Sequence, residues 1–382
     1  MMPINRKYPL AELVACLQRY PLPKRRRITL EYTLIAGVND DPKDADKLAD
    51  LIMSCIEVDP EARPASMDDV FQRLDLIHAM LLAGQDPEKV ARANKANAKA
   101  YQPALEKIAG FDINWNIISW PGTAWALQVF PGEPEDVAVT RLADAIFAAS
   151  RVDNDDPVAA WTAHNAALRA RTEWLNGQRF SALRYSGPGT ELTIGLADGH
   201  EWQGGASTAK NGIVCNPNIP TEEVFTTPHA MRVEGRVRST KPLSYQGTLI
   251  DDIAVRFEGG RIVEATASRG LEVLNKVLDT DEGARRLGEV ALVPHSSPIS
   301  ASGLLFYNTL FDENAACHIA LGQCYSKCFV DGASLTPEQI AAQGGNKSLI
   351  HIDWMIGSGE LDIDGVTADG TTVPVFRKGE WA

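Results

Sequence analysis

Long hydrophobic runs and paired cysteines are missing from this sequence. No apolar stretch approaches the roughly 18 residues that a membrane-spanning helix needs, so we expect no membrane partner. The N-terminal stretch MMPINRKYPL has no apolar segment of the kind found in signal peptides. The 6 cysteines show no disulfide-like spacing, so we expect a cytoplasmic protein.

Positive charge is in short supply too. The chain has 37 Lys and Arg against 50 Asp and Glu, a net charge of -13, which argues against a nucleic-acid partner. The basic run KRRR, residues 24–27, is typical of a solvated turn. Carboxylates are plentiful, and such groups can gather around a metal ion. With 382 residues the chain is long enough for two or three domains.

Residues 1–53 differ in character from the rest of the chain. Their patterns predict a helix, a strand in ITLEYTLIAG, a turn and a second helix. The words PINRKYPL, RRRITLEY and GVND resemble the radical-SAM methyltransferases of ribosomal RNA, in which Asn39 would lie near S-adenosylmethionine. The CxxxCxxC iron-sulfur triplet of that family is missing, so we expect a methyltransferase-like fragment without that activity.

Residues 54–77 change character again. A Cys-x-x-x-Asp-Pro-x-x-Arg-Pro pattern, followed by a helix capped at Ser66, resembles the last helices of a protein-kinase C-lobe. The Gly-rich loop and the HRD and DFG segments of a kinase are missing. We therefore expect a helical kinase-tail-like fragment without kinase activity.

From residue 78 onward the sequence reads continuously. Helical patterns cover residues 88–110, 134–152 and 155–176, and the last of these begins with Asp155, Asp156 and Pro157, which are strong start signals. The stretch 113–131 suggests a strand with aromatic turns.

After Asn176 the pattern turns to strands and tight turns. We therefore expect an α+β fold in this part of the chain. It would consist of a partial, truncated helical α/β domain at 78–175 and a strand-rich, metal-binding catalytic domain at 176–382.

The segment DENAACHIALGQCY, residues 312–325, combines acids, a histidine, a tyrosine and cysteines. We expect a helix from about 314 to 327, in which His318 and Tyr325 share one face because they are seven residues apart. The cysteines at 317, 324 and 328 form a second stripe, and core packing is the simplest role for it. Zinc binding by cysteine is disfavoured because no CxxC pair is present.

Other acids and histidines occur in apolar, strand-like segments. In HIDWMI, His351 and Asp353 would face the same side of a strand and could clamp a metal. In LGEVALVP, Glu289 is costly to bury unless it is paired or binds a cation. In PTEEVFT, Glu222 and Glu223 would point to opposite sides, so at most one binds directly.

These groups fit a two-metal site with mixed nitrogen and oxygen ligands. The absence of HExxH excludes the commonest zinc-protease geometry.

Residues 78–382 resemble the thermophilic-type metallo-aminopeptidases, the aminopeptidase T and S family. The matching words, in order, include WTAHN, GPGTELTIGL, NIPTEEVFTTP, LGEVALVP, FYNTLFDENAACHIALG, GGNKS, HIDWMIG and LDIDG. The resemblance implies six metal-binding positions: Glu223, Glu289, Glu313, His318, His351 and Asp353.

The resemblance also suggests roles for individual residues. Glu289 would bridge two metals, Tyr325 would assist catalysis, and Glu222 is the candidate general base. Five histidines match no ligand position, and we expect surface or structural roles for them: His78, His164, His200, His229 and His295.

The resemblance implies a hydrolase that releases the N-terminal amino acid from peptides with a free amino terminus. Two divalent ions, zinc, cobalt, manganese or magnesium, would activate the attacking water. The family is dimeric, so we expect a homodimer. The alternative is a catalytically impaired metal-binding or interaction protein, because the N-terminal part of the family pattern is replaced here.

Overall fold

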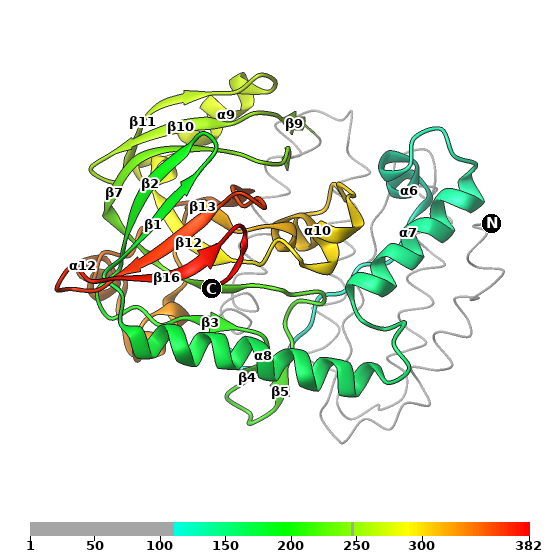
Figure 1. Ribbon diagram of the computed structural model, residues 1–382, viewed down its shortest axis with the longest axis horizontal. Coiled ribbons are helices and arrows are strands. Elements are labelled where there is room, and N and C mark those ends of the chain that lie inside the picture. The colour runs from blue at the N-terminus through cyan, green and yellow to red at the C-terminus, as the bar shows by residue number, and fades with distance from the viewer. Residues whose placement is uncertain (1–110, 246–247) are drawn as a thin grey trace, which may run out of the picture. The chain divides into compact units, whose positions relative to one another are not determined.

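The computed structural model describes residues 111–245 and 248–382 (Figure 1). The elements and fragments predicted within 1–53 and 54–77, and the helix predicted at 88–110, lie outside the described residues. No helix in the described part of the chain is long and apolar enough to cross a membrane.

The chain forms two compact units. The first, Met1–Ile146 with Thr208–Pro217, is described from residue 111 onward, and the second consists of Phe147–Ser207 and Asn218–Ala382. The combination of helices with open antiparallel sheets confirms the predicted α+β fold.

The first unit contains helix α6 (Thr123–Val129) and most of helix α7 (Glu135–Ala149). Helix α7 confirms the helix predicted at 134–152. Helix α6 is a correction, because a strand with aromatic turns was expected there. The apolar side chains of Ala126 and Phe130, four residues apart, are buried, and this spacing suits one face of a helix. A short pair of strands, β4 (Ser207–Thr208) and β5 (Val214–Cys215), lies at its 208–217 segment.

Helix α8 (Pro157–Gln178) opens the second unit and begins as its sequence predicts. The carboxylate of Asp156 accepts a hydrogen bond from the Ala159 amide at 2.9 Å, and Pro157 occupies the first turn. Leu168 and Leu175 are buried on one face. The helix runs alongside β3 at the bottom of Figure 1.

The second unit is built on two antiparallel sheets. The larger has eight strands in the order β11-β10-β7-β2-β1-β15-β16-β17, and the smaller has five in the order β14-β13-β12-β6-β3. Apolar side chains from both sheets belong to one hydrophobic core, which includes Tyr185 and Trp354. The core holds the smaller sheet in place, and this sheet carries the candidate site.

The strands of the larger sheet are β1 (Ala182–Gly187), β2 (Thr190–Leu196), β7 (Pro228–Arg238), β10 (Ala254–Glu258), β11 (Arg261–Thr266), β15 (Asp362–Val366), β16 (Thr372–Arg377) and β17 (Glu380–Trp381). Those of the smaller sheet are β3 (Gln203–Gly204), β6 (Val224–Thr226), β12 (Leu287–Leu292), β13 (His318–Gly322) and β14 (His351–Met355). Strands β8 (Leu243–Tyr245) and β9 (Thr248–Ile250) form a separate pair.

Short helices connect the strands of the second unit. The α-helices are α9 (Leu271–Leu278), α10 (Pro298–Ser302), α11 (Thr309–Asp312) and α12 (Pro337–Ala342). The 3-10 helices are η2 (Glu282–Arg285), η3 (Glu313–Ala315), η4 (Ser326–Cys328) and η5 (Gly332–Ser334).

The helix predicted from about 314 to 327 is wrong. The chain there forms η3, then the central strand β13, then η4. Every residue of β13 is buried, because the strand lies between β12 and β14 and is covered on both faces. A strand buried in this way shows a continuous apolar run that periodicity cannot distinguish from a buried helix. His318 and Tyr325 therefore do not share a helix face.

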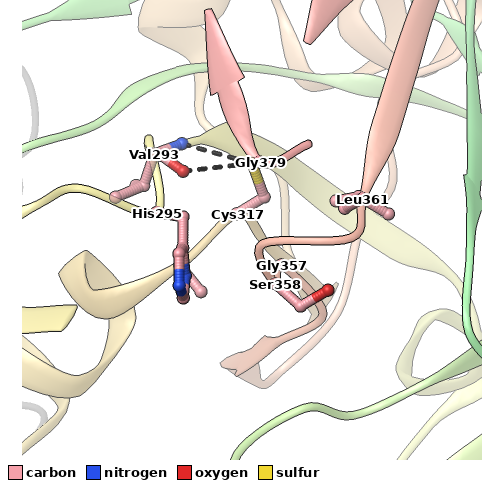
Figure 2. A pocket seen from close by; sticks show the side chains of 8 residues that line it. Val293, His295, Cys317, Gly357, Ser358, Leu361 and Gly379 are labelled. Carbon is pink, nitrogen blue, oxygen red and sulfur yellow. Dashed lines mark hydrogen bonds between the residues drawn. The ribbon is translucent and has the colours of Figure 1, made fainter. Parts of the chain in front are cut away.

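The core-packing role predicted for the three cysteines agrees with their burial. Cys317, Cys324 and Cys328 are buried and free. The sulfur of Cys317 accepts a hydrogen bond from the Val293 amide at 3.4 Å and donates one to its carbonyl at 3.3 Å. Burial raises the pKa of the Cys317 thiol to about 12. This thiol borders a small cavity beside β12 and β13 (Figure 2), whose lining also includes His295, Gly357 and Leu361.

Candidate metal centre

Four of the six candidate ligands lie on three adjacent strands of the five-stranded sheet, β12, β13 and β14. Glu289 and Asp353 are both paired with Ala320, on opposite sides of β13. Directly paired residues in a sheet project to the same face, as do residues two apart on one strand. His318, two residues before Ala320, and His351, two residues before Asp353, therefore share that face.

Glu223 joins this group from the segment that leads into β6. Strand β6 pairs with β12, with Val224 opposite Leu292. The Glu223 carboxylate lies 3.0 Å from His318, measured from Oε2 to Nε2. Five of the six residues that the sequence predicts as ligands thus converge on one face.

The converging atoms form two overlapping groups. Glu223, Glu289 and His318 make the first, and Glu289, His351 and Asp353 make the second, with the ligand atoms of each group within 4.8 Å of one another. Glu289 belongs to both. Its Oε1 lies 3.7 Å from His318 Nε2, and its Oε2 lies 3.7 Å from His351 Nε2.

The polar atoms of this cluster fit a bound cation. Oε2 of Glu223, Nε2 of His318 and Oδ1 of Asp353 are buried and make no well-formed hydrogen bond within the described residues. Their contacts are ion pairs inside the cluster, 3.0 Å between Glu223 Oε2 and His318 Nε2 and 3.5 Å between His351 Nε2 and Asp353 Oδ1. A metal ion placed among them would satisfy all three atoms. Carboxylate oxygen together with imidazole nitrogen suits zinc, cobalt or manganese.

Both histidines are oriented by backbone carbonyls. Nδ1 of His318 lies 3.1 Å from the Ala316 carbonyl oxygen, and Nδ1 of His351 lies 2.7 Å from that of Gln323. A ring that donates its Nδ1 proton to a carbonyl keeps the lone pair on Nε2 free to bind a metal. Both Nε2 atoms face the carboxylates.

The centre concentrates negative charge in a buried place. Burial raises the pKa of Glu289, and the carboxylates of Asp353 and Glu223 raise it further, although His318 opposes them. Burial lowers the pKa of His318, yet the surrounding carboxylates outweigh it and the net pKa is well above its ordinary value. A divalent cation would relieve this repulsion.

Glu313 and Tyr325 complete the surroundings. Burial raises the pKa of Glu313, and the carboxylates of Asp353, Glu223 and Glu289 raise it further. Glu313 therefore interacts electrostatically with the centre. Its carboxylate belongs to neither of the two groups of ligand atoms described above. The ring of Tyr325 lies 4.6 Å from the ring of His351, and 41% of the residue is exposed.

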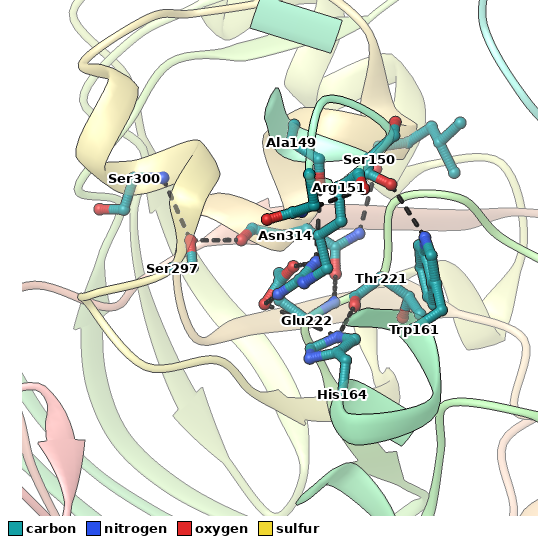
Figure 3. Close-up of polar contacts among 12 residues, drawn as sticks. Ala149, Ser150, Arg151, Trp161, His164, Thr221, Glu222, Ser297, Ser300 and Asn314 are labelled. Atoms are coloured by element: carbon teal, nitrogen blue, oxygen red, sulfur yellow. Dashed lines mark hydrogen bonds and ion pairs between the residues drawn. The ribbon is translucent and has the colours of Figure 1, made fainter. Parts of the chain in front are cut away.

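Glu222 faces different partners. Its carboxylate accepts hydrogen bonds from Nη1 and Nη2 of Arg151 at 2.5 and 2.9 Å (Figure 3). Its Oε2 also lies 3.8 Å from Nε2 of His164. Glu222 and Glu223 therefore contact different partners, as expected for adjacent residues of an extended segment.

Sequence analysis missed Arg151, since a lone arginine after a helix carries no signal of its partner 71 residues away. Three of the other histidines bond to backbone: His164 to the Thr221 carbonyl, His200 to that of Ala197, and His229, whose Nδ1 accepts from the Met231 amide. These contacts agree with structural roles. His78 lies outside the described residues.

Comparisons with known proteins agree with this geometry. Residues 55–381 match the family described as thermophilic metalloprotease (M29). Aminopeptidase T of Thermus thermophilus is 57% identical over 300 residues, which cover 78% of this chain and 73% of that protein. The solved structure of wild-type AmpT from Thermus thermophilus is similar with a TM-score of 0.74 and 50% identity, covering 87% of this chain and 85% of that one.

A second, short match concerns a different class of protein. The dual-specificity RNA methyltransferase RlmN of Sorangium cellulosum is 67% identical over 52 residues, which are 14% of this chain and 13% of that protein. This agrees with the methyltransferase-like words near the start of the sequence. The metalloprotease match begins at residue 55 and so includes nearly all of the segment that resembles a kinase tail.

Proposed function

The chain belongs to the thermophilic metalloprotease family (M29), and we propose from this premise how its metal centre works as that of a metallo-aminopeptidase. The reaction is hydrolysis of the bond that follows the N-terminal amino acid of a peptide. The family match and the similarity to aminopeptidase T disfavour the alternative of an impaired binding protein.

The position of Glu289 supports a centre for two divalent ions. Its two oxygens face two different histidines, so one carboxylate serves both ligand groups. One ion would be held by Glu223, Glu289 and His318, and the other by Glu289, His351 and Asp353. Glu313 would complete the set of ligands.

A bound divalent ion would supply Lewis acidity and would lower the pKa of a water enough for attack at neutral pH. The chain itself supplies orientation and charge. The substrate's free amino terminus is cationic at neutral pH, and a carboxylate of the centre that binds no ion would attract it.

Tyr325 is our candidate for stabilising the developing oxyanion. Partial burial and the nearby carboxylates, Glu289 first among them, raise the pKa of its phenol. The hydroxyl therefore keeps its proton at neutral pH and can donate it in a hydrogen bond. Its ring is held between the rings of His351 and Phe225, whose centres lie 4.6 and 6.3 Å away.

The general-base role of Glu222 stays a prediction. A base must have a free oxygen within hydrogen-bond reach of the proton it removes. Both oxygens of Glu222 accept hydrogen bonds from Arg151. This arrangement favours a different task for Glu222.

The test combines metal analysis with hydrolysis. The full chain is stripped with chelator, reloaded with zinc, cobalt, manganese or magnesium, and assayed on leucyl- and arginyl-p-nitroanilide. We expect about two ions per chain by mass spectrometry and metal-dependent release of nitroaniline. Metal binding without hydrolysis of any substrate would support the impaired alternative, and one tightly bound ion with full activity would refute the two-ion centre.

Two further proposals concern the molecule in the cell. We propose a homodimer, on the resemblance to the aminopeptidase T and S family, and light scattering coupled to size-exclusion chromatography tests it. We also propose a cytoplasmic location, because the four described cysteines are free, as expected in a reducing compartment. Cell fractionation with antibody detection tests this location.

A further inference from the structure

We propose that Arg151 is a positioning residue of the metal centre, which acts through Glu222 and Asn314 on the two segments that carry Glu223 and Glu313. The inference rests on the proposed metal-binding function of these segments. No part of it requires Arg151 to touch metal or substrate.

Arg151 and Glu222 form a bidentate ion pair. Each terminal nitrogen of the guanidinium donates to one oxygen of the carboxylate, Nη1 to Oε1 at 2.5 Å and Nη2 to Oε2 at 2.9 Å. The side chains are 16% and 5% exposed. A two-point contact of this kind fixes orientation as well as distance, and lysine cannot reproduce it.

Arg151 is itself held in place on the turn that joins α7 to α8. Its backbone has φ 57°, a left-handed conformation that residues other than glycine adopt only where the surroundings enforce it. The indole nitrogen of Trp161 donates to the Ser150 carbonyl at 2.8 Å, and the guanidinium lies 5.7 Å from the Trp161 ring. The turn, which Trp161 of α8 holds through Ser150, thus presents the guanidinium to Glu222 (Figure 3).

Glu222 is joined to the second ligand segment through its backbone. Its amide donates to Oδ1 of Asn314 at 2.7 Å, and Asn314 is fully buried. The Asn314 carbonyl accepts from the Ser297 hydroxyl at 2.9 Å, and its side-chain amide donates to the Leu310 carbonyl at 3.0 Å.

Glu222 and Asn314 are each adjacent in the sequence to a proposed metal ligand. Glu223 follows Glu222, and Glu313 precedes Asn314. The hydrogen bond between 222 and 314 therefore lies one residue from each of the two proposed ligands. Any movement of this bond moves both ligand side chains.

Charge explains why Arg151 is needed. Glu222 is buried, and without the guanidinium the one ion-pair partner left to it among residues 111–245 and 248–382 would be His164, at 3.8 Å. A buried carboxylate that loses its hydrogen-bond partner turns toward water. This movement displaces the segment 222–223 and spoils the ligand geometry.

The closing experiment measures metal affinity by competition with a chromophoric chelator for zinc. The variants are Arg151→Met, Arg151→Lys and Glu222→Gln, and the matched control is Arg238→Met, which removes an exposed ion pair with Asp252. We expect the zinc Kd of Arg151→Met to rise about 10- to 100-fold, as for other groups that orient ligands. The zinc Kd of Arg151→Lys should rise less, and that of the Arg238→Met control should stay at the wild-type value.

The melting temperature of each metal-free variant separates positioning from general stability. If Arg151→Met melts lower but binds zinc as tightly as wild type, the residue supports only the fold and the inference is refuted. If Arg151→Met does not fold, the Arg151→Lys and Glu222→Gln variants decide the question by the same criterion. A wild-type chain that binds no zinc would refute the proposed function instead.

Glu222→Gln also separates the two roles open to Glu222. A positioning role predicts a raised zinc Kd and activity that returns at saturating zinc. A general-base role predicts an unchanged Kd and a kcat that stays low at every zinc concentration. The double variant Arg151→Met/Glu222→Gln should bind zinc no more weakly than the worse single variant, because both act through one contact.

Discussion

Replacing Gly322 with alanine should displace His351 and so weaken metal binding. Gly322 ends β13 and has φ +99°, a conformation that side chains other than hydrogen rarely allow. It is paired with His351 on β14. Its amide donates to the Arg286 carbonyl at 2.8 Å and its carbonyl accepts from the Asn346 side chain at 2.6 Å, so it cannot turn away.

The size of the effect follows from the local packing. A Cβ at position 322 would lie 2.1 Å from the Ile350 carbonyl oxygen, whereas real contacts of this kind begin near 3.0 Å. The strands must separate by about 0.9 Å, the difference between these distances. A metal site tolerates only about 0.2 Å in ligand distance, so His351 would leave its position. The strained backbone adds about 1 to 3 kcal/mol.

The assay compares Gly322→Ala with Gly370→Ala. Gly370 also has a positive φ, +85°, but no atom lies within 4 Å of its added Cβ, so the control isolates backbone strain. We expect both variants to lose about 2 to 6 °C in Tm from strain, at about 2 °C per kcal/mol, and Gly322→Ala to lose more. Its zinc Kd should rise about tenfold or more, as when a group that orients a ligand is lost.

If Gly322→Ala melts with the control and keeps the wild-type zinc Kd, the close approach of β13 and β14 does not determine the position of His351.

Three further outcomes are expected. Glu289→Gln should bind about one ion fewer per chain, as measured by metal mass spectrometry. The substitution removes the charge and one of the two oxygens that Glu289 offers to both ligand groups. A variant that retains two ions would contradict the role of Glu289 as a ligand shared by both ions. Tyr325→Phe should lower kcat about 10²- to 10³-fold with KM little changed, in a nitroanilide assay, and a normal kcat would remove Tyr325 from catalysis. Burial lowers the pKa of His200 below its unfolded value of 6.5, so its contribution to stability is present above pH 6.5 and is lost as pH falls below it. Between pH 8 and pH 5 the Tm of the metal-free wild type should therefore fall more than the Tm of metal-free His200→Gln. A Tm difference that stays constant over this range would contradict the prediction.

The strands that carry the ligands were predictable from local pattern. In HIDWMI the alternation of residues predicts a strand, and β14 places His351 and Asp353 on one face as expected. In LGEVALVP the isolated Glu289 within an apolar run indicated a carboxylate with a special partner, and β12 is fully buried.

The segment around His318 shows where pattern fails. Its apolar run fits a helix and a strand buried on both faces equally well, and only pairing with β12 and β14 decides between them. The predicted placement of Tyr325 on a helix with His318 failed for the same reason. The aromatic contact between Tyr325 and His351 replaces it and depends on two segments far apart in the chain.

The sequence by itself determined which residue types are available, where most strands and helices lie, and that Glu222 and Glu223 cannot face the same way. Tertiary structure alone decided that Glu289 serves two groups and that Arg151 holds Glu222. Neighbouring residues determine the local pattern, whereas these relations depend on strand register and on contacts between distant residues, such as Arg151 and Glu222, 71 positions apart.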